Sequence, residues 1–139
     1  MRRIGAAIFF LTGMFGCAEK IEHDLELAAK RAVEFAEVTF VRRNLDKGYA
    51  LLATKARSYV PIEKFNETVS EMHRSGYPIR VTVVGAASPI PGEKVVNVVL
   101  RGEDSGKQFH YRVTVAGTAT TDYRVTTFGG GATPLLPSG

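Results

Sequence analysis

The sequence predicts an α+β fold, in which helices come first along the chain and an antiparallel sheet follows. Over residues 25–72, apolar residues recur at steps of three and four, the spacing of amphipathic helices. Over residues 79–128, apolar and polar residues alternate, as they do along half-buried strands. Short runs rich in glycine, proline and aspartate separate the alternating segments and supply the turns of a meander.

Three helices are predicted in the first half of the chain. The first covers residues 25–44, with Asp24 as its N-cap. Asp46 is suited to cap a second, shorter helix. Pro61 fits the first position of a third helix, which ends at Gly76.

Four strands are predicted in the second half, over residues 79–83, 95–100, 109–115 and 123–128. Residues 95–100 are apolar on both faces, which favours a central position in the sheet. We therefore expect one α+β domain over residues 25–128. Residues 129–139 lack periodicity and are predicted to form a flexible, glycine- and proline-rich tail.

The N-terminus has the layout of a secretory signal peptide. Arg2 and Arg3 give a positive start, residues 4–16 form an uncharged apolar run, and Cys17, the only cysteine, follows. The sequence Met-Phe-Gly-Cys at residues 14–17 resembles the lipobox of bacterial lipoproteins, which is cut just before the cysteine. The resemblance implies a signal peptide of residues 1–16, acyl chains on Cys17 and a lipidated tether of residues 17–24.

Two other interpretations of this segment stay open: a membrane helix that is never cut, and an ordinary secretory signal. The apolar run is shorter than the roughly 20 residues that a bilayer span needs, which favours a cleaved signal. Ala18 follows the cysteine, and in a Gram-negative cell lipoproteins of this type go to the outer membrane. We expect the chain in the bacterial cell envelope, lipid-anchored on the periplasmic face of that membrane.

Charge and cysteine content exclude several classes of function. Without residues 1–16, lysine plus arginine falls from 18 to 16 against 14 acidic residues, so the formal net charge falls from +4 to +2. No dense basic stripe remains, and a nucleic-acid partner is not expected. An acylated Cys17 leaves no thiol for disulfides, and His23, His73 and His110 lack metal-ligand spacing. No metal and no cofactor are expected.

The order of the predicted elements resembles the nuclear transport factor 2-like (cystatin-like, α+β-cone) superfamily. Residues 40–52 are similar to that superfamily's junction into its second helix, and residues 59–65 to its short first strand running into helix three. The resemblance implies that three helices pack into the hollow of a curved antiparallel sheet of about four strands. Such a fold can enclose a pocket for a small hydrophobic ligand.

Side chains from the helices and the inner sheet face would line that pocket, although aromatic residues at this spacing usually fill a core. The expected lining residues are Tyr49, Tyr59, Phe65, Met72, Tyr111 and Tyr123. Catalysis would need a carboxylate or histidine facing the pocket, and the acidic residues of the sheet half fall in turns or at strand ends. No catalytic residue is predicted. An isomerase- or hydrolase-like pocket, or a carrier of small hydrophobic ligands, stays the alternative.

Basic residues alternate with the apolar ones on the opposite sheet face. Arg80, His110, Arg112 and Arg124 are the candidate basic surface patch. Neighbouring strands lie about 4.8 Å apart, so Arg112 and Arg124 are expected to be close. The alternative is that these residues form an ordinary solvent-exposed sheet face with no binding role. We expect a non-catalytic envelope lipoprotein that binds a protein or an anionic polymer through its α+β domain.

Overall fold

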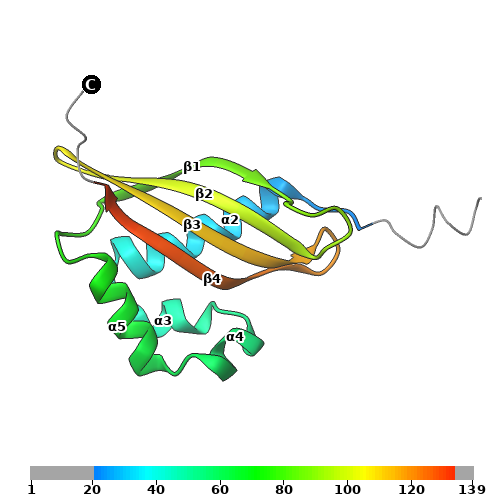
Figure 1. Ribbon diagram of the computed structural model, residues 1–139, viewed down its shortest axis with the longest axis horizontal. Helices are drawn as coiled ribbons and strands as arrows, with labels where there is room; N and C mark the ends of the chain where they lie inside the picture. The colour runs from blue at the N-terminus through cyan, green and yellow to red at the C-terminus, as the bar shows by residue number, and fades with distance from the viewer. Residues whose placement is uncertain (1–20, 134–139) are drawn as a thin grey trace, which may run out of the picture.

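The computed structural model describes residues 21–133 and confirms the α+β class, with N-terminal helices packed against a four-stranded antiparallel sheet (Figure 1). The predicted signal peptide, Cys17 and residues 134–139 of the predicted tail lie outside the described residues. In chain order the elements are α2 (Leu25–Ala36), the π-helix η1 (Glu37–Val41), α3 (Leu45–Ala50), α4 (Thr54–Tyr59), α5 (Ile62–Met72), β1 (Arg80–Ala87), β2 (Val95–Asp104), β3 (Lys107–Thr118) and β4 (Asp122–Thr133).

The sheet is a meander in which each strand pairs with the next along the chain, in the order β1-β2-β3-β4. One extra residue, Val84, interrupts the register between β1 and β2, and another, Thr126, interrupts it between β3 and β4. Bulges of this kind bend a strand and increase its twist. The long strands therefore coil across the molecule instead of lying flat (Figure 1).

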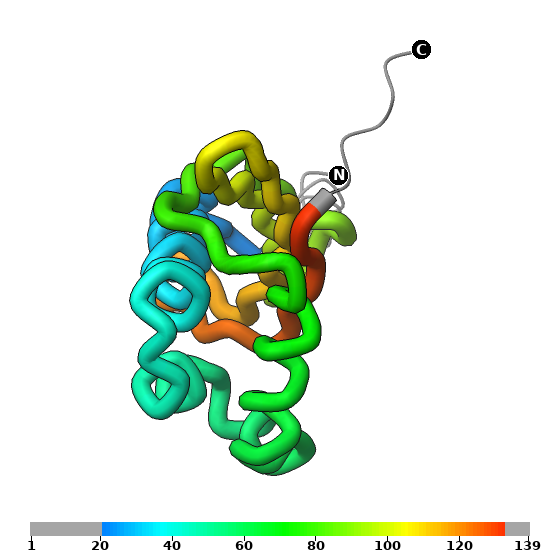
Figure 2. Tube along the Cα trace, turned by 90° about the vertical axis from the view of Figure 1, so that its left-hand side faces the viewer, coloured from blue at the N-terminus to red at the C-terminus, as the bar shows by residue number. Residues whose placement is uncertain are grey.

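Helix α2 covers the inner face of the sheet, and the shorter helices gather beyond the β4 edge (Figures 1 and 2). Ala28, Ala32 and Ala36 are fully buried on α2, and their small side chains let the helix lie close to the strands. Asp24 caps α2 as predicted, because its carboxylate accepts a hydrogen bond of 3.0 Å from the amide of Leu27.

Aromatic rings fill the space between the helices and the sheet. Phe40 stacks on Tyr111 with ring centroids 4.6 Å apart, and Phe35 and Phe65 each contact Phe128, at 5.2 and 5.5 Å. Tyr49 meets the edge of Phe65 at 5.4 Å. These rings interlock elements that are far apart in the sequence, and they form the centre of the core.

The predicted second helix is instead two short helices, α3 and α4, and its N-cap is Asn44 rather than Asp46. The break has a tertiary cause. Leu52 forms a parallel bridge with Val125 of β4, and the Ala53 amide donates to the Val125 carbonyl at 2.7 Å. A backbone that pairs with a strand edge cannot continue a helix. The strand expected before the third helix is also absent from the described residues, since Tyr59 ends α4.

The domain extends past both predicted boundaries. The Glu22 carbonyl accepts from the Ala119 amide at 2.9 Å and the Asp24 amide donates to the Tyr123 hydroxyl at 2.9 Å, so the end of the predicted tether is hydrogen-bonded to the domain. Strand β4 continues to Thr133, and residues 129–133 are paired with β3 rather than forming the start of a tail. Within residues 21–133 there is no helix long and apolar enough to cross a bilayer.

Candidate functional site

The candidate site is the outer face of the sheet, on the side away from α2. Its centre is a cross-strand set of basic residues: Arg101 of β2 lies opposite His110 of β3, and Val99 lies opposite Arg112. Diagonal neighbours in an antiparallel pair have side chains about 7–8 Å apart, so Arg101 and Arg112 are adjacent. All three basic side chains are exposed. Arg101, His110 and Arg112 are called the basic face below.

Glycines leave space around Arg112. Across the four strands, its row reads Gly85, Val99, Arg112 and Gly129. A Cβ atom added at Gly85 or at Gly129 would meet no other atom within 4 Å. The Arg112 guanidinium therefore stands in an open row, where a partner can approach the sheet backbone closely.

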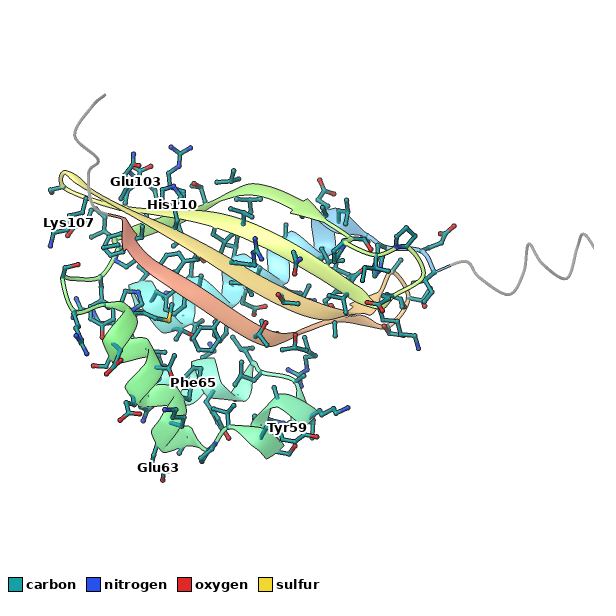
Figure 3. All side chains as sticks on the ribbon, in the orientation of Figure 1. Tyr59, Glu63, Phe65, Glu103, Lys107 and His110 are labelled. Atoms are coloured by element: carbon teal, nitrogen blue, oxygen red, sulfur yellow. The ribbon has the colours of Figure 1, made fainter. Side chains whose placement is uncertain are left out.

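The two arginines of the basic face have no ion-pair partner in the described part of the chain. Among residues 21–133, no acidic side chain forms an ion pair with Arg101 or Arg112. Arg80, on the β1 edge, is different, since it pairs with Glu103 at 3.2 Å. Figure 3 shows His110 at the same end of the sheet as Glu103 and Lys107, near the β2–β3 turn. The outer face is thus electropositive at its centre and mixed in charge at that end.

The register corrects the expectation that Arg112 and Arg124 adjoin. Arg124 pairs with Ala116, whereas Arg112 pairs with Gly129. The two arginines are four residues apart along the ladder, or about 13 Å at 3.3 Å per residue. Of the four residues in the predicted patch, the structure brings together His110 and Arg112, while Arg80 and Arg124 lie toward other parts of the sheet.

Sequence reasoning missed Arg101. Val96, Val98 and Leu100 are fully buried, so Val99 and Arg101 point outward by simple alternation. The apolar character of residues 95–100 on both faces concealed this period. The arginine directly after the apolar run was the signal that could have identified it.

The six expected pocket residues are not gathered around one open space. Phe65, Tyr111 and Tyr123 are buried in the core, whereas Tyr59 is 75% exposed (Figure 3). Tyr123 lines a cavity of about 290 Å³ beside the β3–β4 turn, and Met72 lines a separate cavity of about 410 Å³ along α5. The remaining member, Tyr49, is half-buried, and its hydroxyl donates to the Val60 carbonyl at 2.6 Å.

A buried histidine–tyrosine pair was also not predicted. His73 is 4% exposed; its Nδ1 donates to the Val69 carbonyl at 2.7 Å, and its Nε2 accepts from the Tyr111 hydroxyl at 2.8 Å. Burial lowers the pKa of His73, and burial with nearby Tyr77 raises the pKa of Tyr111 well above its usual value. Both groups stay neutral and satisfied, so this pair holds the core together.

Comparison of the chain with protein-family models, curated proteins and solved structures gives no match. In the described part of the chain, no three histidine, cysteine, aspartate or glutamate side chains are grouped so as to hold a metal ion. The basic face is therefore the feature from which a function is inferred.

Proposed function

We propose that this chain is a non-catalytic lipoprotein of the bacterial cell envelope, and that the outer face of its nuclear transport factor 2-like domain binds an anionic polymer. Cys17 is the proposed lipid attachment site, on the periplasmic face of the outer membrane. The observation that carries the binding proposal is the pair Arg101 and Arg112, exposed on an open sheet face without an acidic partner among residues 21–133.

Two features favour a charged polymer over an apolar protein surface. Protein interfaces are usually anchored by large aromatic side chains near their centres. On the described strands, every tyrosine and phenylalanine belongs to the inner-facing register, paired with residues such as Gly102, Val113 and Leu100. The outer face offers guanidinium groups and threonine hydroxyls instead, and guanidinium groups bind carboxylates and phosphates through paired hydrogen bonds.

The charged cavity beside the β3–β4 turn is poorly suited to acid–base catalysis. Arg31 donates to both carboxylate oxygens of Asp122 at 2.9 Å beside the 290 Å³ cavity. These hydrogen bonds lower the pKa of Asp122, so its carboxylate is both ionised and occupied. A general base needs a pKa near the working pH, and the pKa of this carboxylate is too low for that role.

The binding proposal is tested by titrating the purified full chain with polygalacturonate and with inorganic polyphosphate, using neutral dextran as the control polymer. The test variant is R101Q/R112Q. A matched control, K64Q/R74Q, removes two exposed positive charges, one in α5 and one just after it, and each of these cations pairs with a glutamate of α5. We expect the basic-face variant to weaken polyanion binding about tenfold or more, equivalent to about 1.4 kcal/mol, and the control to change it little.

Salt provides a second readout, because exposed charges are screened at high ionic strength. The affinity of the wild type should fall more steeply with salt than that of R101Q/R112Q. Equal losses in the two double variants would contradict a specific face and indicate general charge attraction. Preference for an acidic polypeptide over both polymers would redirect the search to a protein partner.

A further inference from the structure

The free edge of the sheet is the feature that the proposed function leaves unexplained. Strand β1 lies at one end of the strand order, and no strand within residues 21–133 pairs with its outer side. The opposite edge is different, because Leu52 and Ala53 pair with Val125 there. An unpaired strand edge presents backbone donors and acceptors to any chain that can add a strand.

This edge lacks the charges that usually protect exposed strands. Residues 81–92 contain no charged side chain, and Arg80 just before them is engaged by Glu103. Large apolar side chains are exposed along it: Ile79, just before β1, is 62% exposed, Val84 within the strand 56%, and Ile90 after it 52%. Lysine, glutamate or proline on an edge opposes pairing; Pro89 and Pro91 come only after β1 ends at Ala87, so within the uncharged part of the strand only the bulge at Val84 serves that purpose.

The geometry points to a second copy of this chain as the occupant, paired antiparallel along β1 about a twofold axis between Val84 and Gly85. In that register Val84 faces Gly85 of the second copy, and Val83 faces Ala86, so each of these two valines meets a small residue. Ile79 then lies near Ile90 of the second copy. A twofold contact is self-complementary by definition, and both strands carry the bulge at the same place.

The absence of charge on this edge also favours a second copy of the chain over a charged foreign strand. A basic or acidic foreign strand finds no opposite charge along residues 81–92, whereas two uncharged edges meet without repulsion in a chain whose formal net charge without residues 1–16 is +2. The chain's own residues 134–139 are a poorer strand for this edge because they contain Pro134 and Pro137, which remove ladder donors. Pairing would give one eight-stranded sheet with the two basic faces side by side.

The test is sedimentation equilibrium of the purified full chain in a detergent solution matched to the buffer density, so that detergent adds no buoyant mass. The wild type should show a concentration-dependent dimer. V84K should weaken dimerisation at least tenfold, because two ammonium groups meet at the axis, and so should V84E. Mixing V84K with V84E should restore a dimer. The control T127K adds the same charge to exposed β4 and should leave the dimer unchanged.

Amide hydrogen exchange provides a measurement that needs no variant. Exchange over residues 81–87 should slow as the wild-type concentration rises through the dimer range, while exchange in α5 should not change. A chain that stays monomeric at every concentration would overturn the inference. A dimer whose strength is the same in V84K, with the circular dichroism spectrum of the wild type, would overturn it as well, because that dimer forms through another surface.

Discussion

At the scale of single residues, His73 shows how tightly the core constrains one polar group. Its ring lies between Tyr77, at a centroid distance of 4.4 Å, and Phe40, at 4.9 Å. The Val69 carbonyl can only accept, so Nδ1 carries the proton and Nε2 receives the hydroxyl proton of Tyr111. The alternating and helical patterns of the sequence gave no indication of this pair, because it joins a helix end to a strand.

The neutral His73 predicts a pH-dependent stability. Its folded-state pKa lies below the ordinary 6.5, so the unfolded chain binds the proton first as pH falls. Stability should therefore decrease below pH 6.5, by up to about 1.4 kcal/mol per pH unit, until the folded-state pKa is reached. Denaturant unfolding at several pH values measures this slope.

Asp122 does not interfere with that measurement. Its pKa is lowered from 3.8, so the stability that it contributes is lost only at lower pH. H73Q should remove the slope between pH 6.5 and 5. A slope unchanged in H73Q would show that another group is responsible.

At the scale of elements, local sequence signals predicted where most helices and strands begin, but they did not predict where a helix is interrupted. The Asp24 cap and the α5 stripe were predictable because they depend on neighbours within four residues. The division into α3 and α4 was not, because it depends on Leu52 reaching β4. The contact between α3 and η1 is similar: Gly48 lies so close to Thr39 that an added Cβ would be 2.2 Å from the threonine hydroxyl oxygen.

This contact reverses the usual effect of replacing a helical glycine. Alanine normally gains up to about 1 kcal/mol over glycine in a helix. Here G48A should destabilise the fold by about 1–3 kcal/mol, because the new methyl group overpacks against Thr39. In a T39A background the hydroxyl is gone, and the same substitution should be neutral or stabilising. Chemical denaturation of the wild type, G48A, T39A and the double variant gives the coupling free energy between the two positions. Additive changes in the free energy of unfolding would contradict the close contact.

At the scale of the whole molecule, the class and the number of strands followed from the sequence, but the composition of the site did not. Alternation predicted that His110 and Arg112 face outward, which does not require knowing the register. The register is needed to know which basic residues are neighbours. Arg112 pairs with Gly129, which places Arg124 far from it, and Arg101 pairs with His110, which places Arg101 next to the basic residues of β3. Register between long strands depends on turn geometry and bulges such as Thr126, which periodicity does not reveal.

The proposed envelope function depends first on the acylation of Cys17. The most direct measurement is a mass spectrum of the protein isolated from native membranes, beside a C17A variant. The proposal predicts a mature chain that begins at Cys17 and carries two or three acyl chains, enough for firm anchoring, with no such species in C17A. A chain that keeps residues 1–16, or that begins elsewhere without acyl groups, would contradict it and remove the membrane from the proposed function.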